Sequence, residues 1–369
     1  MDNLSFDKRN GFIWYNGEIV AWNTANVHVL NHGLHYASCV FEGERAYNGR
    51  IFESQQHTKR LFDSAKSLDM EIPYSQKEIL EAKEMLLEKN SLLDAYVRPV
   101  VWRGSEMMAV SAQATKIHVA IATWEWPSYF DPEQKMKGIK LDIAKWRRPS
   151  PECGPVLAKA AGLYMICTLS KHEAEAKGYS DALMLDYRGQ VAEATGANVF
   201  FKMPDGKLHT PLADCFLDGI TRRTVMKLAE ENDIQIIERK IMPEEMAEAE
   251  ECFLTGTAAE VTPVQSIRRA LINLLTNAIR YAGKAKAKIQ IFDDHSEIVI
   301  DDNGPGIPRD KREEVILPFT RLDNSRNNQT GGTGLGLSIA KNAALNHGGE
   351  LILEESPLGG LRVRLLLPL

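Results

Sequence analysis

The sequence predicts a multidomain protein of mixed α/β and α+β class. Its 369 residues suffice for two or three domains of ordinary size. Over the first 267 residues, short stretches rich in β-branched and aromatic residues alternate with helical patterns, as in folds that combine sheets with helices. From residue 268 a second set of helix and strand patterns begins. We therefore expect domains at 1–130, 139–267 and 268–369.

The first expected element is a β-hairpin. Residues 11–22 contain two short strand patterns on either side of Asn16 and Gly17, a dipeptide typical of tight hairpin turns. The elements expected next are a helix at 76–90, strands at 95–104 and 116–126, an interdomain connection at 127–138, a helix at 160–177, strands at 181–187 and 197–202, and a helix at 221–232.

The last hundred residues predict a further helix-and-sheet unit. The expected elements are a helix at 268–282, strands at 288–294 and 297–303, a loop rich in glycine, asparagine and threonine, a helix at 336–348 and a hairpin at 350–367. This part has a net charge of +2 against −8 for the rest, and all six tryptophans lie at or before Trp146. Such shifts in composition often mark a change of module.

Composition excludes several classes of protein. With 44% hydrophobic and 25% charged residues, the chain is neither disordered nor collagen-like. Neither part is basic enough to indicate nucleic-acid binding, and no apolar run is long enough for a membrane span. The five cysteines are scattered and form no C-x-x-C pair, which argues against a disulfide framework or a zinc site and favours a reducing, cytoplasmic location.

Four segments carry residue types that suit one chemistry. Lys159 lies among small residues in PVLAKAAGLYM, where a ring can approach the backbone and the amine can form a Schiff base with an aldehyde cofactor. Glu193 begins EATGANVFF, a small-residue stretch that leads into a strand pattern. Residues 219–221 (G-I-T) begin a predicted helix, where free N–H groups favour phosphate. Residues 255–257 (T-G-T) supply hydroxyls and amides of the same kind.

Together with HGLHYASCVFEGERAY, HTKRLFDSAK, AYVRPVVWRG and GTAAEVTP, these segments make residues 11–267 resemble the fold-type-IV pyridoxal-phosphate enzymes, and among them the branched-chain amino acid aminotransferases. The resemblance implies a two-domain aminotransferase fold. It implies that Lys159 holds pyridoxal 5′-phosphate as an internal aldimine and then moves the proton, and that Glu193 keeps the pyridine nitrogen protonated. The other implied cofactor contacts are Arg60, Tyr164, Ile220, Thr221 and Thr257.

The resemblance also implies the substrates. An apolar, aromatic pocket would admit leucine, isoleucine and valine as well as glutamate, so the expected reaction is transamination with 2-oxoglutarate. The expected partners are small amino acids and 2-oxo acids, together with further copies of the chain in a homo-oligomer. The residues implied for substrate binding are Tyr36, Phe41, Tyr96, Arg98, Trp126, Tyr129 and Ala258.

Residues 268–369 carry four ordered motifs of another chemistry. In NLLTNAIRY, Asn273 and Asn277 lie four residues apart on one predicted helix face, from which both can reach a metal-bound triphosphate. Asp302 in DDNGPGIP can accept a hydrogen bond from an exocyclic amine beside a tight glycine turn. LPFTRLD follows, and GGTGLGLSIAKN then ends a glycine-rich loop at a helix start, where backbone amides can face phosphates.

The four motifs together resemble the ATP-binding domain of sensor histidine kinases, an α/β sandwich. The resemblance implies Mg-ATP as a ligand, with Asn277 on the magnesium. The residues implied for ATP binding are Asn273, Asn277, Asp302, Gly304, Gly306, Gly332, Gly334 and Gly336. None of the nine histidines stands in an HELRTP-like context, so neither a phosphoacceptor nor kinase activity is expected.

The two resemblances meet at residues 267 and 268 without any linker composition. The aminotransferase pattern stops there short of its last strands and helix, and the ATP-binding pattern begins without its first helix and strands. This arrangement is typical of a spliced chimera. Three functions stay open: a transaminase, an ATP-binding signalling protein, and an inactive chimera. Visible absorbance from a cofactor on Lys159 distinguishes the first from the others.

Overall fold

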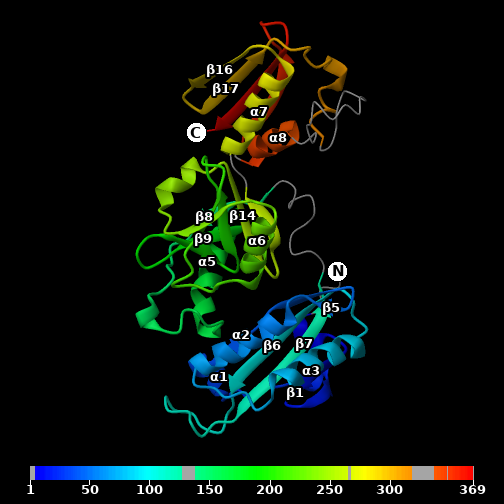
Figure 1. Ribbon diagram of the computed structural model, residues 1–369, viewed down its shortest axis with the longest axis vertical. Coiled ribbons are helices and arrows are strands. Elements are labelled where there is room, and N and C mark those ends of the chain that lie inside the picture. Colours follow the sequence, from blue (N-terminus) through cyan, green and yellow to red (C-terminus); the bar gives the residue numbers. More distant parts are fainter. Residues whose placement is uncertain (1–4, 127–137, 265–266, 318–335, 347, 369) are drawn as a thin grey trace. The chain divides into compact units, whose positions relative to one another are not determined.

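The computed structural model describes residues 5–126, 138–264, 267–317, 336–346 and 348–368, and divides the chain into two compact units (Figure 1). The N-terminal unit comprises Met1–Lys135, Ile139–Ala249 and Phe253–Thr262, and the C-terminal unit comprises Met136–Gly138, Glu250–Cys252 and Pro263–Leu369. Both units combine helices with sheets, which confirms the mixed class expected from the sequence. Within these described ranges, no helix is both long and apolar enough to cross a membrane.

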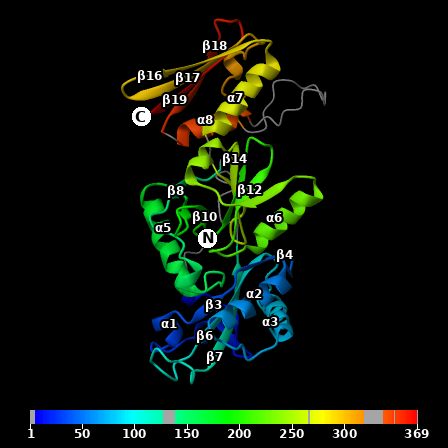
Figure 2. The same cartoon turned by 60° about the vertical axis from the view of Figure 1, so that its left-hand side comes forward.

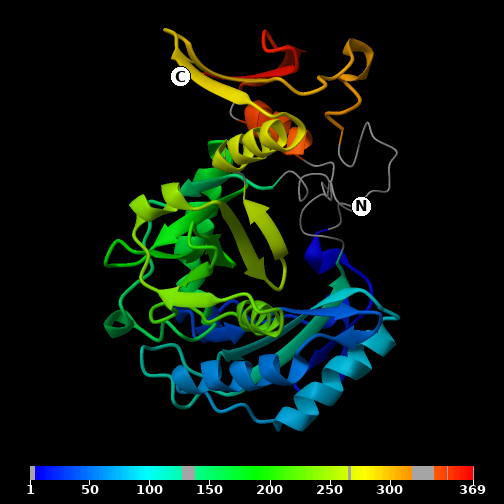
Figure 3. The same cartoon turned by 45° about the horizontal axis from the view of Figure 1, so that its top comes forward.

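A seven-stranded antiparallel sheet forms the first part of the N-terminal unit. Its strands follow the order β2-β1-β7-β6-β4-β5, and β3 also pairs with β6. Helices α2 (Ser54–Ser67) and α3 (Gln76–Lys89) pack along it through a core that includes Leu61, Ile79 and Val101 (Figure 3). The other elements are β1 (Phe12–Tyr15), β2 (Glu18–Ala21), α1 (His32–Tyr36), β3 (Cys39–Phe41), β4 (Glu44–Tyr47), β5 (Arg50–Ile51), β6 (Ala95–Arg103) and β7 (Ile117–Glu125).

Two smaller sheets belong mostly to the N-terminal unit, with strand orders β10-β9-β8 and β13-β12-β11-β14-β15. In the first, β9 pairs antiparallel with β10 and parallel with β8; in the second, β12 pairs antiparallel with β11 and parallel with β13. The elements are β8 (Leu141–Ile143), α5 (Met165–Ala176), β9 (Asp181–Leu185), β10 (Val191–Ala194), β11 (Asn198–Lys202), β12 (Leu208–Pro211), α6 (Ile220–Glu231), β13 (Ile236–Arg239), β14 (Glu251–Gly256) and β15 (Glu260–Val264).

The C-terminal unit is a four-stranded antiparallel sheet, in the order β16-β17-β19-β18, with two helices on one face (Figure 2). Leu274, Ala340 and Leu365 are buried between the helices and the sheet. On the opposite face, Arg362 pairs with Asp301 directly across from it at 2.8 Å. The elements are α7 (Ile267–Tyr281), β16 (Ala285–Ile291), β17 (His295–Asp302), α8 (Gly336–Asn346), β18 (Glu350–Glu355) and β19 (Leu361–Pro368).

Several of the predicted elements are confirmed with their local causes. The first hairpin turns at Asn16 and Gly17, whose φ angles of 50° and 95° are both positive, as a type I′ turn requires. The helix expected at 76–90 is α3, and it begins with a capping box between Ser75 and Glu78. The long strands and the C-terminal hairpin also lie where the hydrophobic pattern predicts them.

The helix predicted over 160–177 is wrong at its start. Ala160 is extended (φ −87°, ψ 132°) because it forms an isolated antiparallel bridge with Val40 of β3. A 3-10 turn at Ala161–Tyr164 follows, and α5 begins only at Met165. Pairing with a distant strand therefore overrides the local helical pattern at the lysine segment.

A fully buried ion pair connects the first sheet to its helices. Lys83 Nζ of α3 lies 2.6 Å from Glu44 Oε1 of β4 and donates to the Thr58 hydroxyl at 2.7 Å. Glu44 and Lys83 are both 0% exposed. Burial raises the pKa of Glu44, and the charge of Lys83 opposes that rise. Each charge therefore depends on its partner, since water reaches neither.

Replacing Lys83 by methionine should destabilise the N-terminal unit by about 3–5 kcal/mol, because Glu44 stays buried without a counter-charge. The loss should be larger at pH 8 than at pH 5, where Glu44 can take up a proton. Urea denaturation followed by tryptophan fluorescence measures this, because every tryptophan belongs to the N-terminal unit. The double variant Glu44→Gln/Lys83→Met should recover most of the loss. Unchanged stability in the single variant would contradict the role of the pair.

Candidate active site

One cavity in the N-terminal unit gathers the residues expected to contact a cofactor. It opens to solvent and spans about 560 Å³, a volume that includes part of that solvent. Its lining comes from the segment around Lys159, the start of β11, the start of α6 and the turn after β14. All seven predicted cofactor residues line it: Arg60, Lys159, Tyr164, Glu193, Ile220, Thr221 and Thr257.

Lys159 is held through both its main chain and its amine. Its N–H donates to Ser64 Oγ of α2 at 3.0 Å, and its carbonyl accepts from the Phe41 N–H at 3.2 Å. Its Nζ donates to Tyr164 Oη at 2.8 Å and lies 5.1 Å from the ring centres of Phe41 and Tyr164. The amine of Lys159 therefore pairs with the hydroxyl of Tyr164 and lies near two aromatic rings.

Glu193 is a buried carboxylate in the same lining. Arg148 Nε lies 3.3 Å from Glu193 Oε1, and Asn198 Nδ2 donates to Glu193 Oε2 at 3.3 Å. Burial raises the pKa of Glu193 to about 7, although the charges of Arg148 and Lys159 act to lower it. This carboxyl can therefore exchange a proton near neutral pH.

The start of α6 supplies hydrogen-bond donors to the cavity. Gly219 is the N-cap, and the first turn contains Ile220 and Thr221 without any acidic residue. The first N–H groups of a helix have no partner within it and favour an anion. Thr255 Oγ1, buried at 1% exposure, has no hydrogen-bond partner among the described residues. Since buried hydroxyls are normally paired, this orphaned group fits a bound acceptor such as phosphate.

Arg60 adds a charged donor to this part of the lining. Its Nε and Nη2 donate to the two oxygens of Glu42 at 2.7 and 2.9 Å, and its Nη1 donates to the Asp218 carbonyl at 3.4 Å. Glu42 also accepts from His57 Nδ1 at 2.7 Å. Burial alone would raise the pKa of Glu42, but Arg60 and His57 hold it well below its ordinary value.

Sequence reasoning missed Arg148, Asn198, Glu42 and His57. Asn198, Glu42 and His57 lie within the quoted motif segments, so their position near the site was visible, but their pairing was not. Arg148 lies outside those segments and is 4% exposed. A buried arginine or carboxylate needs a partner, and the partner can lie anywhere in the chain.

The six described residues among those expected to bind substrate do not line this cavity, but Phe41 adjoins it through its N–H, which donates to the Lys159 carbonyl. The ring of Phe41 lies 4.9 Å from that of Tyr164, and the guanidinium carbon of Arg98 lies 4.7 Å from the Phe41 ring centre. Arg98 Nη2 donates to Tyr96 Oη at 3.3 Å, and the rings of Tyr96 and Trp126 are 4.9 Å apart. A continuous aromatic and cationic group therefore contains the predicted substrate residues Phe41, Arg98, Tyr96 and Trp126.

The other predicted substrate residues are less closely connected to it. Tyr36 of α1 is 46% exposed and stacks on His32 at 4.5 Å. Ala258 lies in the turn between β14 and β15, directly after the lining residue Thr257. Tyr129 lies outside the described residues.

In the C-terminal unit, the residues expected to bind ATP form two groups. Asn277 lies against the start of α8: a Cβ at Gly336 would come within 2.7 Å of Asn277 Nδ2. Asp302 Oδ1 accepts from the N–H groups of Gly304 and Leu361 at 2.9 and 3.0 Å. Gly306, with φ of 69°, follows in the same turn. Gly332 and Gly334 lie outside the described residues, as does the side chain of Asn273.

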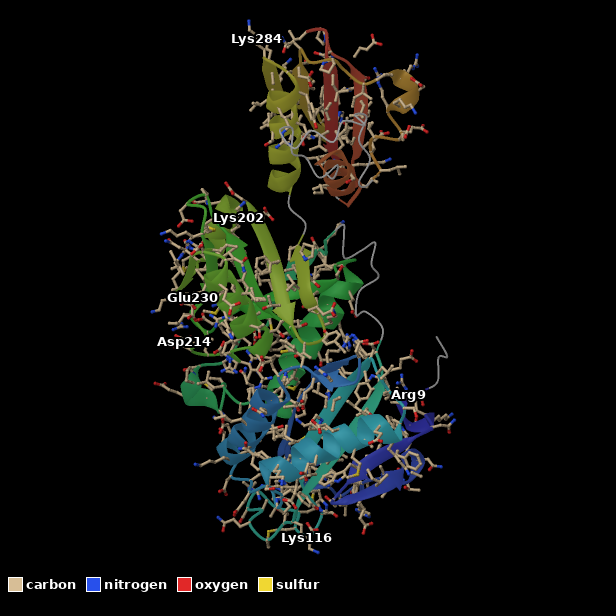
Figure 4. The ribbon with its side chains drawn as sticks, turned by 45° about the vertical axis from the view of Figure 1, so that its right-hand side comes forward. Arg9, Lys116, Lys202, Asp214, Glu230 and Lys284 are labelled. Atoms are coloured by element: carbon tan, nitrogen blue, oxygen red, sulfur yellow. The ribbon has the colours of Figure 1, made fainter. Side chains whose placement is uncertain are left out.

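One cluster within the described ranges groups side chains of metal-binding type, Asp186, Asp214 and Cys215. Arg188 donates to Asp186 Oδ2 at 2.7 Å and to both oxygens of Asp214 at 2.8 and 2.7 Å. Asp214 lies at the surface (Figure 4). Arg188 therefore bridges the two carboxylates, so the cluster is an ion-pair network.

The chain matches two family models. Residues 39–267 match the class IV amino-transferases, and residues 263–369 match the histidine kinase-, DNA gyrase B- and HSP90-like ATPases. Among curated relatives, a probable branched-chain-amino-acid aminotransferase of Rickettsia bellii is 44% identical over 69% of this chain and 87% of its own length. The branched-chain-amino-acid aminotransferase of Pseudomonas aeruginosa is 44% identical over 72% and 87%.

Solved structures give the same picture. The crystal structure of the Escherichia coli branched-chain amino acid aminotransferase is similar with a TM-score of 0.68 and 38% identity, over 70% of this chain and 86% of that one. The branched-chain amino acid aminotransferase from Thermobaculum terrenum, solved in its PLP-form, gives a TM-score of 0.63 and 31% identity over 70% of this chain and 85% of that one.

Glu193 should make the cofactor-free protein less stable as the pH rises. Its pKa is about 7 in the folded chain and near 4.5 when unfolded, so the folded state binds more protons between these values. Relative to Glu193→Gln, the free energy of unfolding of the wild type should fall by up to about 3 kcal/mol from pH 4.5 to 7.5.

Urea denaturation with tryptophan fluorescence at a series of pH values measures this difference. Glu230→Gln, at an exposed glutamate of α6 (Figure 4), is the matched control and should keep the wild-type pH dependence. The same pH slope in Glu193→Gln as in the wild type would contradict the raised pKa.

Proposed function

This chain belongs to the class IV amino-transferase family, and we propose that it transfers amino groups between branched-chain L-amino acids and 2-oxoglutarate with pyridoxal phosphate as its cofactor. One observation carries the proposal: Lys159, Glu193 and the start of α6 meet at a single cavity. We infer the substrates from the names of the relatives, and we infer the cofactor from the donor groups that line the cavity.

The lining residues fit pyridoxal phosphate. Lys159 offers the amine, Glu193 a carboxylate for the ring nitrogen, and the first turn of α6 offers N–H groups for the phosphate, with Thr255 and Arg60 as further donors. When bound, this cofactor supplies an aldehyde that reacts with amines and a ring that accepts electrons. The remaining chemistry falls to the side chains of this protein.

In this proposal, Lys159 has two tasks at one atom. Its Nζ holds the cofactor and afterwards takes a proton from the substrate carbon and returns it one position away. Tyr164 Oη, 2.8 Å from Nζ, orients the amine between these steps. The contacts of the Lys159 main chain with Ser64 and Phe41 keep the same amine in the cavity throughout.

Glu193 holds a proton at the ring nitrogen of the cofactor. A carboxylate at that position favours the protonated ring, which is the better electron acceptor. Arg148, 3.3 Å from Glu193 Oε1, favours the ionised carboxylate, while burial opposes it. The pair of opposing effects keeps Glu193 able to share a proton near neutral pH.

The substrate side chain would lie against Phe41, Tyr96 and Trp126, whose rings suit branched aliphatic groups. Arg98 supplies the charge for a carboxylate; its Nε is buried and has no hydrogen-bond partner among the described residues. Ala258, Tyr129 and Tyr36 complete the proposed contacts. A homo-oligomer fits the exposure of the apolar residues near Tyr36, among them Leu34 at 67%.

A second proposed activity is binding of Mg-ATP by the C-terminal unit. The match to the ATPase family and the contact between Asn277 and Gly336 favour it. The bonds of Asp302 Oδ1 to two backbone N–H groups leave that oxygen less able to accept from adenine. Phosphoryl transfer also needs an acceptor in line with the γ-phosphate, and no histidine stands in a suitable motif.

Lys159→Ala should abolish turnover of L-leucine with 2-oxoglutarate, since both tasks of Nζ are lost. With the wild type, pyridoxal phosphate should produce visible absorbance that changes on addition of L-leucine, and borohydride should fix the cofactor to the peptide that contains Lys159. Lys177→Ala, at a half-exposed lysine of the same unit, is the control and should behave as the wild type. Cofactor fixed to another lysine would show the assignment to be wrong.

Incubation of the full chain with γ-labelled ATP and Mg²⁺ should give no acid-labile phosphohistidine, because no acceptor histidine is in place. Any nucleotide binding should be weak and should disappear in Asn277→Ala, which removes the proposed magnesium ligand. Filter binding of labelled ATP and acid-stability analysis of the protein label measure the two outcomes. Label on the wild-type chain that is lost in Asn277→Ala would favour a signalling function instead.

A further inference from the structure

Glu42 has no place in the chemistry described so far, yet it is a fully enclosed charge bound to Arg60 of the cavity lining. It is 0% exposed and accepts three hydrogen bonds, two from Arg60 and one from His57, all between 2.7 and 2.9 Å. Both of its oxygens are occupied. A carboxylate bound in this way cannot rotate without breaking at least one charge-assisted bond.

The bidentate contact fixes one edge of the Arg60 guanidinium. Nε and Nη2 face Glu42, so Nη1 is the nitrogen left for other acceptors. Nη1 lies 3.4 Å from the carbonyl of Asp218, the residue that precedes the N-cap Gly219 of α6. The free end of Arg60 is thus already aimed at the helix start that offers the other phosphate donors.

From this geometry we propose that Glu42 is a positioning residue: it holds Arg60, with His57 behind it, so that Nη1 is ready for the cofactor phosphate. The inference rests on the proposed function of the cavity. An arginine side chain loses much rotamer freedom when it is fixed, and Glu42 imposes that loss before any ligand arrives. The resulting gain in affinity should therefore come from the phosphate of the cofactor and not from its ring.

Two opposite effects of Glu42 have to be weighed. Its negative charge repels a phosphate, whereas its hold on Arg60 favours phosphate binding. The repulsion is partly cancelled, since Arg60 and His57 donate to the same carboxylate. Orientation should prevail, because loss of one well-placed charged donor costs about 10- to 100-fold in affinity.

The test compares pyridoxal phosphate with pyridoxal, which lacks the phosphate, by absorbance titration of the full chain after removal of bound cofactor. The dissociation constant of pyridoxal divided by that of pyridoxal phosphate isolates the contribution of the phosphate to binding. In Glu42→Gln this ratio should fall about 10- to 100-fold while pyridoxal binds as in the wild type. Arg60→Gln should lower the ratio similarly, and the double variant should lower it no further.

Glu44→Gln is the matched control. Glu44 is equally buried two residues further along the chain, but its ion pair is with Lys83 of α3 and not with Arg60. If Glu44→Gln only lowers the stability of the fold, it should weaken the binding of pyridoxal and of pyridoxal phosphate equally and leave the ratio unchanged. Glu42→Asp keeps the charge but is too short to reach both nitrogens, so it should lower the ratio even if Glu42→Gln fails to fold.

The outcomes distinguish failure of the positioning role of Glu42 from failure of the proposed cofactor site. If Glu42→Asp and any folded Glu42→Gln keep the wild-type ratio, the positioning role is wrong. A higher ratio would assign Glu42 to repulsion alone and overturn it as well. A wild type that binds pyridoxal as tightly as pyridoxal phosphate would refute the proposed cofactor site itself, on which this inference depends.

Discussion

The side-chain amide of Asn198 connects the parts of the cavity that bear opposite charges. Its Nδ2 donates to Glu193 Oε2 at 3.3 Å and to the Leu217 carbonyl at 3.0 Å, and its Oδ1 accepts from the Gly219 N–H at 3.1 Å. One buried side chain therefore fixes β10, the start of β11 and the N-cap of α6 relative to one another. A Cβ at residue 219 would collide with Asn198 Oδ1, so only glycine allows this approach.

Sequence reasoning predicted the fold best where the cause is local. The turn at Asn16 and Gly17 and the start of α3 at Ser75 depend on residues within three positions of each other, and the hairpin and the helix both appear as expected. The late start of α5 at Met165 could not be predicted in this way. It depends on the bridge between Ala160 and Val40, which are 120 positions apart. Non-local pairing leaves no periodic trace in either segment.

The same distinction holds for the candidate site. Lys159, Glu193 and the start of α6 were identified from motifs, and their common cavity follows from the fold. The partners that set their charges were not identified: Arg148 beside Glu193, and Glu42 beside Arg60. A motif gives the residue that meets a ligand, whereas its counter-ion is chosen by tertiary packing and can belong to any element.

The different partners of two lysines, Lys83 and Lys159, decide which amine is open to chemical reaction. Lys83 is fully enclosed and paired with the carboxylate of Glu44, so its nitrogen has no route to a reagent. Lys159 lines a cavity, and its Nζ donates a hydrogen bond to the hydroxyl of Tyr164. Under the proposed function, this difference leaves Lys159, and not Lys83, accessible to the carbonyl group of the cofactor.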